Sequence, residues 1–304
     1  MKRIFFVILF TSVCSFSEIQ ACDICGCGVN NYYIGILPQF NHTFFGTRYY
    51  FSSYNTRLAA DPTQFSKDFY QTTELWGGWN IGKKFQLLAF VPYNFNHQHS
   101  DEGITNTKGL GDITLLGNYK VFDIRSVTPG NKVISQQLWI GGGVKLPTGK
   151  FNLESTTQDV ASIANGQLGS GSMDVLLHAM YNIRINRLGF NSAVSYKINS
   201  ANKDEYRFGD KLSVSSFASY SISSSKITIN PNFGLLYEHT KASELQASKI
   251  ALTGGSILNG SAGIEMSFKK MAIGFNVQLP ITQNFAQNQT KENIKGMVHV
   301  SFAI

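Results

Sequence analysis

Hydrophobic and polar residues alternate one by one along several segments of the chain. In segment 271–281 every second residue is large and apolar, namely Met271, Ile273, Phe275, Val277, Leu279 and Ile281. Segments 227–237, 174–184 and 298–304 repeat the pattern with polar or charged residues between the apolar ones. Side chains of a β-strand point alternately to opposite faces, so a strand between lipid and a polar interior must alternate in this way. The pattern predicts membrane-spanning β-strands.

Counting the alternating runs predicts about twelve strands. Their expected ranges are 42–58, 67–80, 84–98, 107–122, 135–148, 169–186, 188–200, 205–222, 226–240, 252–268, 270–282 and 294–304. An even number returns both ends of the chain to the same side of the membrane, as in single-chain bacterial barrels. Short connections alternate with longer ones, as expected for periplasmic turns and external loops, apart from a long turn at 123–134 and a short loop at 201–203.

Composition separates the barrel from a soluble β-sandwich, which also alternates. A sandwich would direct its apolar residues inward and place abundant charge outside, and soluble domains carry about 25% charged residues. This chain has 43% hydrophobic and only 15% charged residues. We therefore predict an all-β fold, a closed antiparallel transmembrane β-barrel of about twelve strands over residues 42–304. The net charge of +7 has no long basic run, so we expect no nucleic-acid partner.

The N-terminus predicts export. Lys2 and Arg3 precede the apolar run 4–10, and a small residue, Ala21, precedes Cys22. This pattern is typical of a signal peptide over residues 1–21, and the apolar run is too short for a membrane-spanning helix. We expect an outer-membrane location with both termini in the periplasm. The expected partners are outer-membrane lipid, the barrel-assembly machinery, which would read the terminal strand, and a small-molecule solute, with the protein a monomer.

The predicted periplasmic segment 22–41 contains Cys22, Cys25 and Cys27, the three cysteines that remain after residue 21. An odd number cannot pair completely within one chain. Three interpretations compete: lipidation of Cys22, binding of a soft metal such as Cu(I) by the three thiolates, or a disulfide from Cys25 or Cys22 to Cys27 in an oxidising compartment.

Two histidines, His97 and His99, share one strand face and could share a metal, although a solvated strand end is the simpler interpretation. His178 and His299 would be available to a barrel hydrolase. The sequence shows no serine–histidine arrangement with a recognisable orienting group, so we expect no enzyme.

Charged residues at inward positions form a candidate pore lining. They are Glu74, Asp112, Lys120, Lys145, Asp174, His178, Arg184, Lys197, Glu238, Glu265 and His299. Charges out of water must be paired or hydrated. The set therefore predicts either a lining that selects solutes or an ion-pair network that packs a narrow lumen.

Several short motifs occur in a characteristic order. They are CDICGCG at 22–28, GILPQF at 35–40, GLGDI at 109–113, LPTG at 146–149, GSGSMD at 169–174 and YRFGD at 206–210. With them the chain resembles the outer-membrane barrels named for the MetA pathway of phenol degradation, and in particular the Bacteroidetes-type members often called transporter family proteins. The resemblance implies a barrel that moves small compounds, aromatic or hydrophobic ones among them, across the outer membrane.

Two functions of different classes follow. The first is an outer-membrane pore or transporter for such a solute. The second is a copper-capturing accessory protein, in which the cysteine segment binds the metal and the barrel anchors it.

Overall fold

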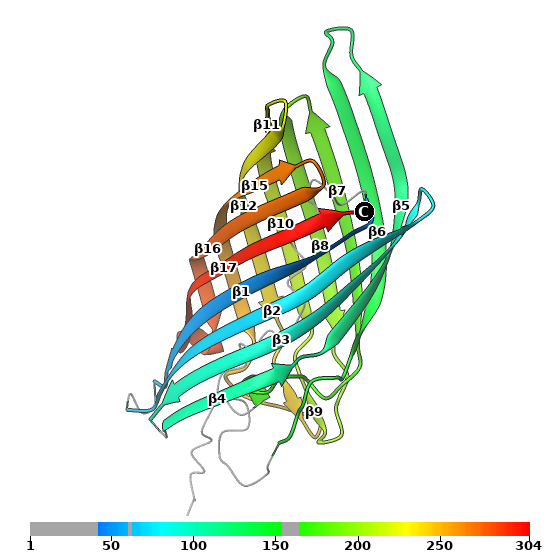
Figure 1. Ribbon diagram of the computed structural model, residues 1–304. Coiled ribbons are helices and arrows are strands. Elements are labelled where there is room, and N and C mark those ends of the chain that lie inside the picture. Colours follow the sequence, from blue (N-terminus) through cyan, green and yellow to red (C-terminus); the bar gives the residue numbers. More distant parts are fainter. Residues whose placement is uncertain (1–41, 60–62, 102, 154–163) are drawn as a thin grey trace, which may run out of the picture.

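The computed structural model describes residues 42–59, 63–101, 103–153 and 164–304, and it is built from β-strands (Figure 1). The long strands are β1 Phe44–Arg57, β2 Phe65–Ile81, β3 Phe85–Ser100, β4 Gly103–Leu110, β5 Ile113–Val127, β6 Val133–Leu146, β7 Asp174–Ile185, β8 Leu188–Ile198, β10 Lys211–Tyr220, β12 Ile227–Thr240, β15 Gly255–Phe268, β16 Met271–Phe285 and β17 Thr290–Ala303. The short elements are β9 Tyr206–Arg207, β11 Ile222–Ser223, β13 Glu244–Leu245, β14 Ser248–Lys249 and a 3-10 turn, Ala286–Asn288.

Twelve strands close into a barrel, which confirms the predicted fold class. Each strand of the ring pairs antiparallel with the next, and β1 pairs with β17 from Phe44 opposite Ala303 onward. Strands β4 and β11 extend this sheet by pairing with β3 and β12. The long strands close on themselves, and the second sheet is a small one formed by the two-residue strands β9, β13 and β14, so the sandwich alternative is excluded.

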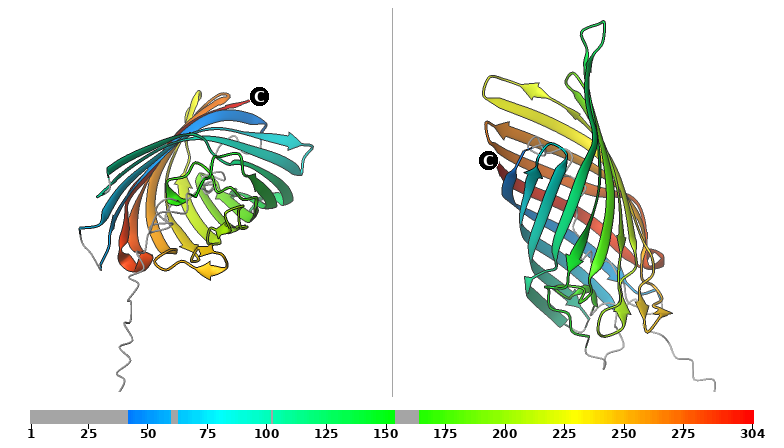
Figure 2. Two further views of the ribbon diagram at one scale, coloured as in Figure 1. Left: turned by 90° about the horizontal axis from the view of Figure 1, so that it is seen from below. Right: turned by 90° about the vertical axis from the view of Figure 1, so that its right-hand side faces the viewer.

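The two ends of the barrel differ. We call the end that holds Ile304 and the turns after β2, β5, β7, β10 and β15 the C-terminal end, and the other the loop end. The β5–β6 hairpin rises beyond its neighbours at the C-terminal end (Figures 1 and 2). The expected long turn at 123–134 is wrong, because β5 continues to Val127 and only 128–132 form the turn. The fourth expected strand, 107–122, is broken into β4 and β5 at Gly111 and Asp112.

The outer surface of the barrel is apolar. Exposed large side chains alternate with lumen-facing ones along most of the long strands, among them Leu75, Trp79, Ile140, Phe233, Leu279 and Phe302. The ring strands contain 10 to 17 residues, enough for the roughly 9–11 residues that a tilted strand needs to cross the hydrocarbon region. No helix within the described residues has the length and apolarity to span a membrane.

The main hydrophobic cluster lies inside the ring, on the wall formed by β1 to β7. It consists of Phe44, Trp76, Leu88, Phe90, Leu116, Trp139, Leu176 and Met180. A water-filled pore would present polar side chains here. The inner wall of this barrel instead carries large apolar side chains along β1, β2, β3, β5, β6 and β7, with buried polar side chains such as Gln86 and Asn118 among them.

Candidate functional site: the barrel lumen

A row of ionisable side chains crosses the lumen wall at the level of the main cluster. The register places Glu265, Gly274, His299, Arg48 and Glu74 side by side on β15, β16, β17, β1 and β2. All four ionisable side chains of the row are at most 2% exposed. Each carboxylate has a cationic or imidazole neighbour, so the row forms two pairs.

The first pair joins Arg48 and Glu74. The Arg48 guanidinium donates its Nε hydrogen to Glu74 Oε1, and its Cζ lies 4.7 Å from the ring centroid of Trp76 and 4.9 Å from that of Phe90. Stacking on aromatic faces suits a planar, weakly hydrated guanidinium. The pair is thereby held between apolar rings and away from water.

The second pair joins His299 and Glu265, whose Nε2 and Oε1 atoms are 2.8 Å apart. Gly274 stands between them on β16, and a Cβ at this position would overlap both Glu265 Oε1 and His299 Nε2. The absence of a side chain at Gly274 therefore lets the pair meet across an intervening strand. The His299 ring also stands edge-on to Trp76, with centroids 5.9 Å apart.

Three of the sequence motifs meet at the loop end. Lys145 Nζ lies 3.0 Å from Asp112 Oδ2 and 2.5 Å from Asp174 Oδ2. Asp112 also accepts the backbone N–H groups of Gly149 at 2.9 Å and Ser170 at 2.8 Å. Motifs GLGDI, LPTG and GSGSMD thus build one buried cluster, which ties the β6–β7 connection to the break between β4 and β5.

We expect Asp112→Asn to lower the free energy of unfolding by about 2–3 kcal/mol, because the buried Lys145 loses one of its two carboxylates and two N–H groups lose a charged acceptor. The midpoint of urea unfolding of the protein in lipid vesicles, followed by tryptophan fluorescence, measures the change. Asp123→Asn is the matched control. Its ion pair with Lys120 is partly exposed, so we expect at most about 1 kcal/mol. Equal effects of the two substitutions would contradict the role of Asp112 in stabilising the buried cluster.

The YRFGD motif forms a second cluster beside the first, which we call the loop-end cap (residues 199–210 and 241–250). Asp210 Oδ1 accepts the Asn199 N–H at 3.0 Å, and its carboxylate lies 3.2 Å from Arg207 and 3.1 Å from Lys241. Burial alone would raise the pKa of Asp210, but this hydrogen bond and the two cations hold it below its ordinary value. The pKa of Lys241 is raised by Tyr196 and Asp210.

This lowered pKa predicts how the cap responds to acid. A carboxyl group whose pKa is depressed in the folded state stabilises the fold above its unfolded pKa, near 3.8, and loses that contribution as the pH falls through the folded pKa. We expect the cap to resist pepsin at pH values above the unfolded pKa, near 3.8, and to be cleaved within 199–210 once the pH falls below the folded pKa of Asp210. In Asp210→Asn the susceptibility of the cap should no longer change with pH, and an unchanged acid response in that variant would contradict this role.

A third network lines the loop-end half of the lumen. Glu238 on β12 lies 3.0 Å from Lys211 on β10 and 3.4 Å from Lys295 on β17. Lys295 also pairs with Glu292 at 2.7 Å, and Asn259 Nδ2 donates to Glu292 Oε1 at 2.8 Å. Alternating positive and negative groups along this wall cancel most of their charge.

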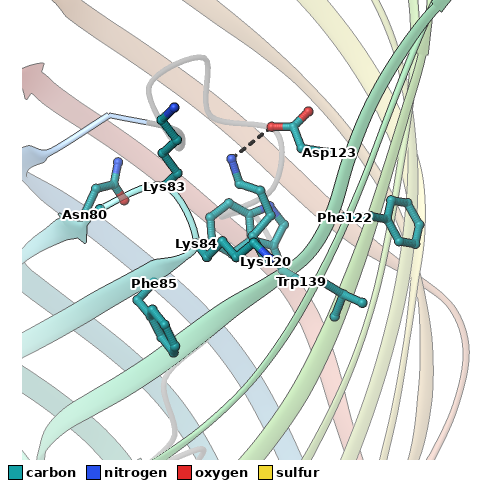
Figure 3. Close-up of a pocket in the computed structure, with 10 residues that line it drawn as sticks. Asn80, Lys83, Lys84, Phe85, Lys120, Phe122, Asp123 and Trp139 are labelled. Atoms are coloured by element: carbon teal, nitrogen blue, oxygen red, sulfur yellow. Dashed lines mark hydrogen bonds and ion pairs between the residues drawn. The ribbon is translucent and has the colours of Figure 1, made fainter.

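A pocket of about 540 Å³ opens at the C-terminal end of the lumen (Figure 3). The register of β5 against β6 shifts between Lys120 and Phe122, which marks a β-bulge at Val121. The bulge leaves Lys120 and Asp123 on the same side, with Lys120 Nζ 3.0 Å from Asp123 Oδ2. Lys120 Nζ also lies 4.8 Å from the ring centroid of Trp139.

The predicted lining residues occupy lumen-facing positions, except that Asp112 lies in the break between two strands. Buried ion pairs engage Glu74, Asp112, Lys145, Asp174, Glu238, Glu265 and His299. Lys120 and Arg184 stand at the C-terminal end, whereas His178 and Lys197 lie on β7 and β8. The sequence reasoning missed Arg48, Lys211, Glu292 and Lys295. A role of any of these residues in selecting solutes stays a prediction.

The metal predictions have different outcomes. Cys22, Cys25 and Cys27, with the expected signal peptide, lipidation and Cu(I) binding, lie outside the described residues. His97 and His99 share a face of β3, as predicted, but His97 Nδ1 contacts Asn106 Oδ1 at 2.6 Å and His99 packs edge-on against Phe65. The described residues contain no group of three or more potential metal ligands.

Comparison with known proteins supports the fold. No family model and no curated protein matches the sequence. An outer membrane channel from Pseudomonas putida F1 is similar in structure, with a TM-score of 0.60 and 14% identity over 88% of this chain and 97% of that one. The beta domain of the Bordetella autotransporter BrkA (TM-score 0.49, 9% identity, 86% and 100% covered) and the CymD monoaromatic hydrocarbon channel (0.41, 7%, 90% and 92%) are more distant. The chain thus has the fold of an outer-membrane channel, and its resemblance to the phenol-degradation barrels stays a prediction.

Proposed function

We propose that this protein is an outer-membrane pore or transporter with a constricted passage for small hydrophobic or aromatic solutes. The observation that carries the proposal is the apolar inner wall formed by the main cluster inside a closed barrel. The interior of an eight-stranded barrel is filled by side chains or holds one small ligand, whereas about 16–18 strands leave an aqueous channel. This ring of twelve strands lies between these sizes, and the large side chains of the main cluster narrow its lumen. Large apolar side chains on that wall favour an apolar ligand.

The ion pairs of the lumen support the same conclusion. A polar channel gains selectivity from rings of charge that remain open to the passing solute. Here Arg48, Glu74, Glu265 and His299 bind one another and are buried. Groups that are already paired offer little attraction to an ion or a sugar.

The proposed location is the outer membrane, with both termini on the periplasmic side. Outer-membrane barrels have short periplasmic turns and longer external loops. Turns at the C-terminal end of this barrel are short, whereas longer connections, including 199–210 and 241–254, lie at the loop end. The C-terminal end would therefore face the periplasm.

Uptake by a Gram-negative host that lacks its major porins tests the function. We expect cells that produce the protein to take up radiolabelled naphthalene faster than cells with the empty vector, with sucrose uptake unchanged. Heat-modifiable gel migration verifies that equal amounts of folded barrel are present. Unchanged naphthalene uptake, or faster sucrose uptake alone, would contradict the proposal.

A pair of variants separates passage through the lumen from an effect on the membrane. Leu116 points into the lumen and Leu115, its neighbour, points to the lipid. We expect Leu116→Trp to reduce naphthalene uptake by narrowing the passage, and Leu115→Trp to leave it unchanged.

A further inference from the structure

The C-terminal mouth of the lumen combines an aromatic ring with an excess of positive charge. Lys120 is partly buried, with a side chain 14% exposed, and stands over the face of Trp139. Lys83 comes from the β2–β3 turn and lines the same pocket, which also includes Asn80 (Figure 3). An ammonium held at an aromatic surface keeps less of its hydration shell, which strengthens its attraction for an anion.

One carboxylate side chain, Asp123, lines this pocket among the described residues, and other groups already engage it. It pairs with Lys120 and accepts a hydrogen bond from Gln137 Nε2 at 3.0 Å. Lys83 brings a second ammonium to the same pocket. The lining is therefore cationic overall.

Two arginines extend this positive surface along the tall hairpin and the strand beside it. Arg125 on β5 and Arg184 on β7 both lie opposite Ser135 on β6. With strands about 4.8 Å apart, the backbones of the two arginines are separated by roughly 10 Å. Arg125 follows Asp123 by two residues and so points to the same face as the pocket.

Turns at this end add charge of the same sign. Their basic residues are Lys83, Lys84, Lys132, Arg187, Lys226, Lys269 and Lys270, and segments 82–84, 128–132, 186–187, 224–226 and 269–270 contain no Asp or Glu. A mouth lined by one sign of charge raises the local concentration of oppositely charged ligands.

From this arrangement we propose that the pocket at the C-terminal mouth binds a small aromatic carboxylate. The carboxylate is held by Lys120 and Lys83, and the ring lies over the Lys120 side chain, which covers the buried Trp139. The pocket, at about 540 Å³, falls within the size range of small-molecule sites. Most inner surfaces of the barrel carry self-compensated charge, so this mouth is where an anion finds cations that are incompletely paired.

Isothermal titration of the full-length protein in detergent with benzoate, and with its neutral isostere benzamide, tests the site. We expect benzoate to bind and benzamide to bind at least about tenfold more weakly, because the neutral amide cannot form charge-assisted hydrogen bonds to the two ammonium groups. Benzoate binding should also weaken at high salt. No binding of benzoate, or equal binding of the two compounds, overturns the proposal.

Three substitutions locate the binding site. We expect Lys120→Gln to weaken benzoate binding about tenfold and Asp123→Asn to strengthen it, since Lys120 is then released from its intramolecular partner. Lys226→Gln removes the same charge from a turn at the same end but outside the pocket, and should change affinity less than about twofold. Equal weakening by Lys120→Gln and Lys226→Gln would show that benzoate responds to the overall positive charge of this end and not to one pocket, and it would overturn the proposed site.

This inference rests on the lumen assigned in the proposed function, but its test requires no transport. Benzoate binding without faster naphthalene uptake would support the binding site and contradict the proposed pore function. Faster naphthalene uptake without benzoate binding would support the pore function and contradict the binding site.

Discussion

Replacing Glu74 by leucine is expected to lower the free energy of unfolding by about 3–5 kcal/mol, because it leaves the buried Arg48 guanidinium without its carboxylate partner. Arg48 is 2% exposed and surrounded by aromatic rings, so water cannot replace Glu74. Urea unfolding in lipid vesicles measures the loss, and heat-modifiable migration should show unfolding at a lower temperature.

The double variant Arg48→Met/Glu74→Leu tests this explanation. It replaces both charges by apolar groups, and such replacements of buried pairs are often neutral or stabilising. We expect it to recover most of the stability lost in Glu74→Leu. If the double variant is less stable than the single one, the pair contributes net stability beyond the cancellation of charge, and this explanation is wrong.

The second large loss of stability is expected when Gly274 is replaced by alanine. The added Cβ would overlap atoms of both Glu265 and His299, so the pair must separate inside the barrel wall. We expect a loss of about 2–4 kcal/mol, from overpacking and from broken hydrogen bonding of buried groups.

Gly117→Ala is the matched control for this substitution. Gly117 also lies within a ring strand, but the nearest atom to an added Cβ is Gly142 O at 3.9 Å, an ordinary contact. We expect Gly117→Ala to change stability by less than about 0.5 kcal/mol. Comparable losses in the two variants would mean that any side chain added to the sheet is damaging, and that the Glu265–His299 pair does not explain the effect.

The barrel could be predicted because each residue of a strand must suit either the lipid or the lumen, and this requirement acts on every residue separately. A strand between lipid and lumen must alternate, and β16 does so from Met271 to Ile281 without exception. Strand ends were harder to place. Asp123 to Val127 were expected in a turn, because the bulge at Val121 shifts the alternation by one residue and hides the continuation of β5.

The alternation predicted which side chains face the lumen, but not which of them pair with one another. Parity placed Glu74, Glu265 and His299 on the inner face, yet a pair such as Glu265 and His299 depends on register across three strands. Arg48 was missed because aromatic residues surround it on both faces of β1, so alternation there is weak. The motifs GLGDI, LPTG and GSGSMD lie far apart in the sequence, and only the closed barrel shows that they form one cluster.

Conductance across a planar bilayer shows whether the passage through the barrel is constricted and apolar. The wild-type protein is compared with a triple variant in which Leu88, Leu116 and Leu176, three buried lumen leucines of the main cluster, are replaced by alanine. We expect a small single-channel conductance for the wild type and a clear increase for the folded triple variant. A wild-type conductance as large as that of the variant would contradict a constricted passage.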